Sequence, residues 1–337
     1  MRKNSRLMVL FLVVAMMVTV FAVTADAKAK YTLRFAGNYA HDHPGTQSQY
    51  DIAEEVKQAT NGEVEITVYP GGQLGDYSQV YEDVMRGNVD MGFFYITGQY
   101  NPMLEISSMP YLATTWEGLA KVFSPTSFWY KTYEAAHAEV GVKLLGVYVD
   151  SFISLATMKE PTEPFNVEAN HNILIRIPPA ELYKVTMKDL NYDTVTINWS
   201  DLYTSMQTGV CDGWIGGTAT LNYFQFRDLI KHFYPVRMFV ENVSYIMNKD
   251  TFDGLPEEYQ KIVFDACQKQ AKFSVENAQK TEAEYQKKLA DENGVKIHDI
   301  TQEDIETLAA QVRKASWPKF AKMFGEDVIQ GLISDTQ

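Results

Sequence analysis

The stretch "EVEITVYPGGQLGDYSQVYEDVMRGNVDMGFFYI", Glu63 to Ile96, contains one complete strand–helix–strand unit. Its first eight residues alternate between polar and apolar side chains, which predicts a half-buried strand. A glycine-rich loop follows and enters a helix, for which Asp76 or Ser78 is the candidate N-cap and Gly87 the stop. The run "MGFFYI" then predicts a further buried strand. This order of elements is typical of a parallel sheet with helices on its faces.

The residues on both sides extend this pattern into two α/β units. Upstream, Tyr31–Tyr39 predicts a strand and Gln47–Thr60 a helix, so the chain opens with the β-α-β-α-β order of an open parallel sheet. A chain of 337 residues exceeds what one core usually serves, so we expect two lobes. Downstream, the pattern predicts strands at 142–150, 173–179, 193–198, 211–215 and 242–256, a helix at 180–190, and another between an N-cap at Ser200 and a C-cap at Gly209.

Two long helical patterns close the sequence. The spacing from Pro256 to Lys288 is longer than a typical globular helix and predicts a helix that lies along both lobes. Residues 301–333 are predicted to be helical again. In open α/β sheets ligands bind at the carboxyl ends of the strands, so we expect a site near the loops that follow the predicted strands.

The N-terminus has the features of a secretory signal peptide. Basic residues at positions 2, 3 and 6 precede the apolar run Leu7–Val23, and "ADA" at 25–27 offers a small-x-small cleavage site. A retained membrane anchor is the alternative, because the apolar run is long for a signal peptide. The lack of a following stop-transfer cluster favours cleavage. We therefore expect residues 1–27 to be removed and the mature chain to be a soluble periplasmic protein.

Charge and cysteine content exclude several classes of partner and scaffold. The net charge is −13, and removal of the signal peptide, with three basic residues and one acidic residue, makes it −15. This balance argues against nucleic acid or an anionic membrane surface, although one local arginine can still bind a small anion. Cys211 and Cys267 are too few for a disulfide-dependent scaffold. We expect free thiols, with a disulfide between them as the alternative.

No catalytic or cofactor-binding motif is present. The sequence contains no H-E-x-x-H, no G-x-S-x-G, no P-loop and no G-x-G-x-x-G after a strand. His41 and His43 form only a weak H-x-H pattern, which favours an exposed or ligand-facing loop over a metal clip. Paired acidic residues such as Glu54 and Glu55 lie on predicted helix faces, where solvated charge is usual. We expect no cofactor, no metal site and no enzyme; turnover of a bound carboxylate is the less favoured alternative.

Arg176 is the residue of the second unit that most needs an explanation. It lies in the middle of the apolar strand "ILIRIPP", residues 173–179, with isoleucine on both sides. A guanidinium stays charged in proteins, and burying it without a partner is costly. It therefore faces outward, or pairs with a carboxylate of the protein, or pairs with a carboxylate of a ligand. Its place at the end of a strand makes the last two about equal candidates.

Several segments, taken in order, resemble the substrate-binding proteins of TRAP (tripartite ATP-independent periplasmic) transporters, the DctP-like family. They cover nearly the whole mature chain: "YTLRFAGNY", "EITVYPGGQLGD", "RGNVDMGFF", "MPYL", "LIRIPP", "WSDLYTSMQTGVCDGW" and "GLPEEYQKIV". The resemblance implies a two-lobed periplasmic binding protein fold with a hinge, which closes on a small organic acid and delivers it to membrane permease subunits. We place lobe I at 28–149 plus 241–281 and lobe II at 150–240 plus 282–337, and expect a monomer.

The resemblance also implies the residues of the binding site. In the family, the arginine at the place of Arg176 pairs with the ligand carboxylate, and Trp199 stands at the place of an aromatic wall. First-lobe contacts of the family arise at the places of Asn38, Tyr39, Gln73, Asp76, Phe94 and Tyr95.

Three departures from the family pattern make the expected site more apolar. Phe152 stands where some members that bind acidic sugars or dicarboxylates have a second arginine, Trp214 begins a segment that is often Gln-Glu-Asn, and Pro179 replaces a frequent polar residue. A second carboxylate beside Phe152 and Trp214 would lack a charge partner. We therefore expect a monocarboxylate with an aromatic or apolar part, such as an aromatic amino acid, an indole acid or an aryl or branched 2-oxo acid.

Two alternatives remain open at this point. A C4-dicarboxylate could bind if backbone amides, asparagine, tyrosine or water met its second carboxylate, and Phe152 and Trp214 would then be plain lobe core. The same receptor could also serve as the input of a membrane sensor kinase in place of a permease, because the binding residues do not distinguish these two roles.

Overall fold

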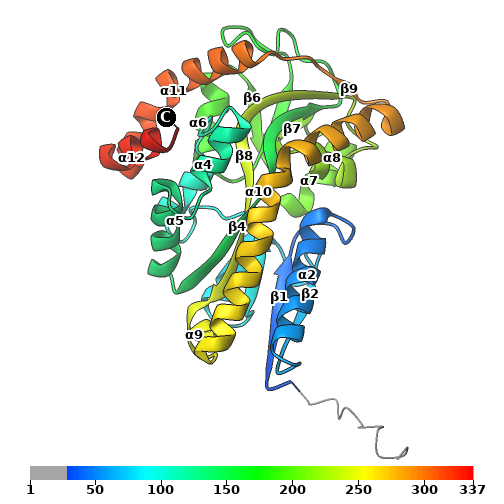
Figure 1. Cartoon of the computed structure of the whole chain (residues 1–337). Coiled ribbons are helices and arrows are strands. Elements are labelled where there is room, and N and C mark those ends of the chain that lie inside the picture. The colour runs from blue at the N-terminus through cyan, green and yellow to red at the C-terminus, as the bar shows by residue number, and fades with distance from the viewer. Residues whose placement is uncertain (1–28, 337) are drawn as a thin grey trace, which may run out of the picture.

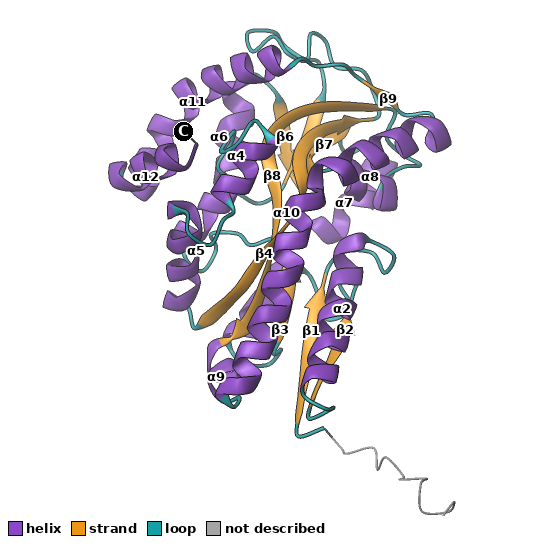
Figure 2. Ribbon diagram, viewed as in Figure 1, coloured by secondary structure: helices purple, strands orange, loops and turns teal. Residues whose placement is uncertain are grey.

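One mixed sheet runs through both lobes of the molecule. The structure, a computed structural model, describes residues 29–336, and the predicted signal peptide with its cleavage site lies outside the described residues. Figure 1 shows the long strands passing from one lobe to the other, and Figure 2 shows helices packed on the sheet. The predicted α/β class and two-lobed fold are confirmed.

The sheet joins two parallel groups of strands through two long antiparallel ones. The order is β2-β1-β3-β8-β4-β7-β5-β6, with β9 beside β8. Neighbouring strands are parallel within β1–β3 and within β5–β7, whereas β4 and β8 run antiparallel to their neighbours in this order. The strands are β1 (Tyr31–Gly37), β2 (Val64–Tyr69), β3 (Met91–Phe94), β4 (Val142–Thr157), β5 (Leu174–Ile177), β6 (Asp193–Thr196), β7 (Gly213–Gly217), β8 (His232–Asn248) and β9 (Lys296–Ile297).

The helices include one that lies along both lobes, as predicted. Helix α10 has 37 residues and contacts α2 and α9 of the first lobe as well as α8 and β9 of the second. Its last residue is Asn293, and the C-cap residue Gly294 has a φ of 68°, which favours glycine. The helices are α2 (Pro44–Ala59), α3 (Tyr77–Met85), η1 (Pro102–Ser108), α4 (Trp116–Val122), α5 (Phe128–Glu139), α6 (Glu181–Asp189), α7 (Trp199–Gln207), α8 (Ala219–Gln225), α9 (Lys249–Asp253), α10 (Glu257–Asn293), α11 (Gln302–Phe324) and α12 (Glu326–Thr336).

The boundaries of individual helices and strands confirm some predictions and correct others. Asp76 is the N-cap of α3, since its Oδ1 accepts from the Ser78 amide at 3.1 Å. The predicted cap at Ser200 is wrong, because the chain is already helical at Trp199 and Asn198 is the N-cap of α7. The predicted strand at 242–256 is the end of β8 followed by α9 and a turn.

Strands β4 and β8 form the connection between the lobes. They pair from Val142–Asn248 at one end to Thr157–His232 at the other. Val149 pairs with Asn242 and the next paired residues are Ser151 and Glu241, so a bulge leaves Asp150 unpaired on β4. The lobe boundaries that we propose at 149/150 and 240/241 therefore face each other in this ladder.

Two further sequence expectations concern the cysteines and the membrane. Cys211 and Cys267 are both buried and free. Within residues 29–336, none of the helices combines the length and the apolar character that a membrane crossing requires.

Helix α10 packs closely on β4 at Gly146. A Cβ atom at this position would lie 3.2 Å from the Ala271 Cβ and 3.3 Å from the Cys267 carbonyl oxygen. We expect Gly146→Val to lower the free energy of unfolding by about 1–3 kcal/mol, because the larger side chain pushes the helix off the sheet. Denaturant-induced unfolding measures this change.

The control lies on the exposed side of the same helix. Phe273, which is 60% exposed, should tolerate replacement by alanine with a change of less than about 0.5 kcal/mol. An unfolding midpoint of the Gly146→Val variant equal to that of Phe273→Ala would contradict the tight contact between α10 and β4.

Candidate functional site

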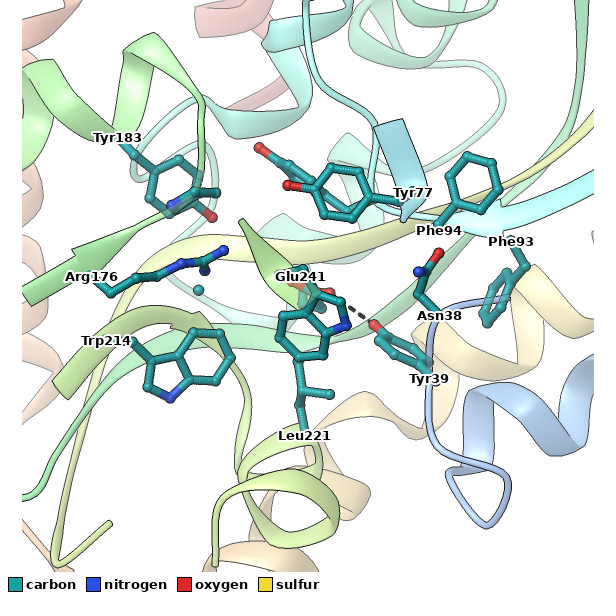
Figure 3. Close-up of a pocket in the computed structure, with 14 residues that line it drawn as sticks. Asn38, Tyr39, Tyr77, Phe93, Phe94, Arg176, Tyr183, Trp214, Leu221 and Glu241 are labelled. Atoms are coloured by element: carbon teal, nitrogen blue, oxygen red, sulfur yellow. Dashed lines mark hydrogen bonds between the residues drawn. The ribbon is translucent and has the colours of Figure 1, made fainter. Parts of the chain in front are cut away.

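A pocket lies where the two lobes meet, near the carboxyl ends of strands β1, β3 and β5 (Figure 3). The first lobe contributes Asn38, Tyr39, Tyr77, Phe93, Phe94 and Tyr95. The second lobe contributes Arg176, Pro178, Tyr183, Trp199, Trp214, Gly216 and Leu221, and β8 contributes Glu241. The location matches the general rule for ligand sites of open α/β sheets.

Arg176 places a buried positive charge in this pocket. Its side chain is 2% exposed, its Nε donates to the Ile197 carbonyl oxygen at 2.9 Å, and its guanidinium lies 5.9 Å from the Trp214 ring. Burial lowers the pKa of the guanidinium, and the nearby groups that oppose this are tyrosines and Cys211. Among residues 29–336 no carboxylate forms an ion pair with it. The two outer nitrogens are thus left for a partner in the pocket.

The local sequence explains why Arg176 points there. Successive side chains of a strand point to opposite faces, so Ile175 and Ile177 share the face opposite to Arg176. Both isoleucines are buried, which holds β5 in the second lobe. The strand ends at Ile177, and Pro178 follows, as the sequence predicted.

Glu241 is a second buried ionisable group in the pocket, and sequence reasoning missed it. Its side chain is 5% exposed, and Tyr39 donates its hydroxyl hydrogen to Glu241 Oε1 at 2.8 Å. Burial raises the pKa of Glu241 to about 8, while the Tyr39 hydrogen bond and the charge of Arg176 act in the opposite direction. The signal was available, because the run "MFVENVSYIM" (238–247) contains one acid among apolar residues.

Asp150 lies at the bulge of β4, near Glu241. It is buried, and its Oδ2 accepts a hydrogen bond from the Thr218 hydroxyl. Burial raises the pKa of Asp150 to about 7, and Asp150 in turn raises the pKa of Glu241. The point where the lobes join therefore holds two acids that bind protons unusually tightly.

Aromatic side chains form most of the remaining wall. Trp214 is buried and donates from Nε1 to Asn222 Oδ1 at 3.0 Å. Trp199 is half-buried, with its ring 5.9 Å from that of Trp214. On the first lobe, the rings of Tyr77 and Tyr95 meet edge to face at 6.0 Å. The pocket can thus hold a flat apolar group beside one charged end.

Comparison with known proteins agrees with this geometry. Residues 35–324 match the family described as "Bacterial extracellular solute-binding protein, family 7", DctP. The chain belongs to this family. DctP proteins are the solute receptors of TRAP transporters and not enzymes, so the predicted family and the absence of an enzymatic role are confirmed.

Relatives with different ligands resemble this DctP protein to a similar degree. The ectoine-binding periplasmic protein TeaA of Halomonas elongata is 24% identical, over 88% of each chain. A TRAP solute-binding protein of Desulfovibrio salexigens with bound orotic acid has a TM-score of 0.81 at 19% identity, covering 91% of this chain and 98% of its own. The Shewanella oneidensis protein with bound succinate also has a TM-score of 0.81, at 16% identity, covering 91% and 99%. These structural similarities establish the fold of this chain.

The structure brings most of the sequence-predicted site residues together. They come from both lobes and line the same pocket: Asn38, Tyr39, Phe94, Tyr95, Arg176, Trp199 and Trp214. Sequence reasoning missed Glu241, Tyr77 and Tyr183, which line it as well. Their roles toward a ligand remain predictions.

Three predicted residues do not line this pocket. The prediction that Phe152 lines this pocket is corrected by the structure. Its ring packs against that of Trp116, with centroids 4.8 Å apart, and lines a different cavity. It pairs with Val240, one residue before Glu241, and adjacent residues of a strand point to opposite faces. Gln73 is exposed, and Asp76 caps α3 and lines another cavity, which shares Asn38 and Trp199 with the pocket.

The histidines that could suggest a metal have other contacts. His43 is buried, and its Nδ1 accepts from the Gly45 amide at 3.0 Å, which caps α2. Away from the pocket, ligand atoms of Glu160, His232 and His298 lie within 4.8 Å of one another. There the two histidines hydrogen-bond each other at 3.1 Å, and Lys296 pairs with Glu160 at 3.0 Å.

The raised pKa values of Asp150 and Glu241 predict how stability depends on pH. Both acids hold their protons to higher pH in the folded chain than in the unfolded chain, where the pKa is near 4. Without ligand, the free energy of unfolding should therefore fall as pH rises from about 4 to about 8, by up to about 1.4 kcal/mol per pH unit and group. Denaturant unfolding across this range measures the slope.

Glu241→Gln should make this decline shallower, because it removes one of the two groups. Other buried acids, Glu105 and Glu282, also have raised pKa values and keep part of the slope. Glu168→Gln at an exposed loop position serves as the control and should leave the slope unchanged. Equal slopes for the wild type and Glu241→Gln would contradict the burial of an ionisable Glu241.

Proposed function

We propose that this DctP-family protein is the extracytoplasmic receptor of a TRAP transporter for an organic acid with one carboxylate and an aromatic or apolar part. The observation that carries the proposal is the buried guanidinium of Arg176, which has no carboxylate partner among residues 29–336. A ligand carboxylate can accept two parallel charge-assisted hydrogen bonds from the outer nitrogens. Such a pair offsets the cost of burying the charge and also orients the ligand.

The rest of the lining favours a single carboxylate over a C4-dicarboxylate. Arg176 is the only arginine or lysine among the described residues that line the pocket, and the one carboxylic acid among them is Glu241, which offers no positive charge. A second carboxylate would therefore meet an acid in place of a base. Trp199, Trp214 and Tyr77 provide apolar surface for the remainder of the ligand.

The C4-dicarboxylate remains the second candidate, because the fold does not choose between the two. The neighbours with bound orotic acid and bound succinate have the same TM-score. Tyrosine hydroxyls and Asn38 could meet a second carboxylate by hydrogen bonds alone.

Transport follows from this binding site and the two-lobed fold. Because both lobes contribute side chains, a ligand that contacts both stabilises their closed arrangement. We propose a periplasmic monomer that hands its ligand to the permease subunits. Service as the input of a sensor kinase would use the same pocket, and growth on the ligand with the permease deleted separates these two roles.

The role of Arg176 as the partner of the ligand carboxylate is tested with the variant Arg176→Ala. We expect Arg176→Ala to weaken binding of aromatic monocarboxylates by about 100-fold or more, since the ligand carboxylate loses its charge partner. Calorimetric titration measures the affinity, and thermal unfolding without ligand checks that the variant folds.

The matched control is Arg86→Ala, which removes an exposed arginine that pairs with Glu82. It should bind as the wild type does. Unchanged affinity in Arg176→Ala would contradict the role proposed for this arginine. An equal loss of affinity in both variants would contradict it as well.

The ligand class is tested by a panel read through tryptophan fluorescence. We expect phenylpyruvate, indole-3-acetate and the aromatic amino acids to include binders that change the emission of Trp199, because it is half-buried in the pocket wall. Trp199→Phe should reduce the signal, with Trp214 of the same pocket wall supplying the remainder, while leaving calorimetric binding detectable. Binding of succinate or malate together with no response to any aromatic acid would overturn the proposed class.

A further inference from the structure

Glu241 gives the pocket a second ionisable side chain besides Arg176. In Figure 3 the guanidinium of Arg176 extends toward the part of the pocket that holds Glu241, while Tyr39 reaches Glu241 from the first lobe. Tyr39 uses Oε1, and Oε2 takes part in no hydrogen bond within residues 29–336. Glu241 and Arg176 also form no ion pair with each other, so a ligand can lie between them.

We propose that Glu241 binds a protonated amino group of the ligand, and that the solute is a zwitterionic amino acid with an aromatic or apolar side chain. This inference rests on the proposed function and narrows it. The carboxylate pairs with Arg176 on the second lobe and the ammonium group with Glu241 on the connecting strand β8. The side chain then lies against the aromatic wall.

Charge balance in a buried pocket is compatible with this assignment, and the Oε2 of Glu241 that takes part in no hydrogen bond within residues 29–336 is available to accept from an ammonium group. An uncompensated charge is costly away from water, so the pocket with its ligand should be close to neutral. A zwitterion adds one charge of each sign, which complements Arg176 and an ionised Glu241. An oxo acid adds only a negative charge and requires Glu241 to stay protonated. Carboxylate–ammonium pairs are also among the stronger hydrogen bonds.

Amino acid and 2-oxo acid ligands require different protonation states of Glu241. Groups that face Glu241 come from every neighbouring element: Tyr39 after β1, Tyr77 of α3, Tyr95 after β3, Asp150 of β4, Arg176 of β5 and Tyr183 of α6. Burial keeps Glu241 largely protonated near pH 7 in the empty pocket, as its pKa of about 8 indicates. An amino acid must therefore release a proton from the protein on binding, and a 2-oxo acid must not.

The test compares amino acids with the 2-oxo acids that share their side chains. Phenylalanine, tyrosine, tryptophan and leucine, and their 2-oxo counterparts, are titrated calorimetrically in phosphate and in Tris. We expect at least one amino acid to bind more tightly than its oxo acid at pH 8. Its heat should differ between the buffers, as proton release requires. Glu241→Gln should weaken the amino acid about 10- to 100-fold and leave the oxo acid within a few-fold.

Controls distinguish a failure of the amino-group assignment from a failure of the proposed function. Glu168→Gln, on an exposed loop, should bind as the wild type does, and thermal unfolding checks that Glu241→Gln folds. If only 2-oxo acids bind, or if Glu241→Gln weakens both types equally, the amino-group assignment is wrong while the proposed function stands. If neither type binds, the amino-group assignment is wrong, and the fluorescence panel with indole-3-acetate, succinate and malate then decides the ligand class. Loss of amino acid binding after dialysis against EDTA would assign Glu241 to a bridging cation and contradict the inference.

Discussion

Arg176 carries a positive charge in a buried strand where no carboxylate of residues 29–336 neutralises it. Apolar packing of Ile175 and Ile177 keeps β5 in the second lobe, so the guanidinium cannot simply turn out to water. One carbonyl oxygen, that of Ile197, accepts from Nε. The remaining donors face a pocket rather than the core, and a buried charge of this kind is better explained by a ligand than by folding stability.

The connection between the lobes places the other charged groups near this arginine. Strands β4 and β8 run through both lobes, and their ladder brings Glu241 close to the bulge that holds Asp150. Burial raises the pKa of both acids, so the charge of a ligand bound at this junction would affect their protonation. Under the proposed function, a ligand that contacts both lobes at this junction would stabilise one of their relative positions.

Sequence patterns predicted much of this molecule. The alternation around Glu63–Ile96 identified β2, α3 and β3, and the order of soft motifs placed Arg176, Trp199 and Trp214. Glu241 was missed because strand β8 begins ten residues before the segment recognised as a strand, at His232. Phe152 was misplaced because a bulge and strand alternation decide the face of a side chain, and these depend on the pairing of β4 with β8.

The central claim is that the partner of Arg176 is a ligand carboxylate, and a crystal structure with a bound aromatic carboxylic acid tests it most directly. The account predicts that both carboxylate oxygens lie about 2.7–2.9 Å from nitrogens of the Arg176 guanidinium, with the apolar part against Trp199 and Trp214. A bound acid whose carboxylate is held elsewhere, with Arg176 turned to a carboxylate of the protein, would contradict it.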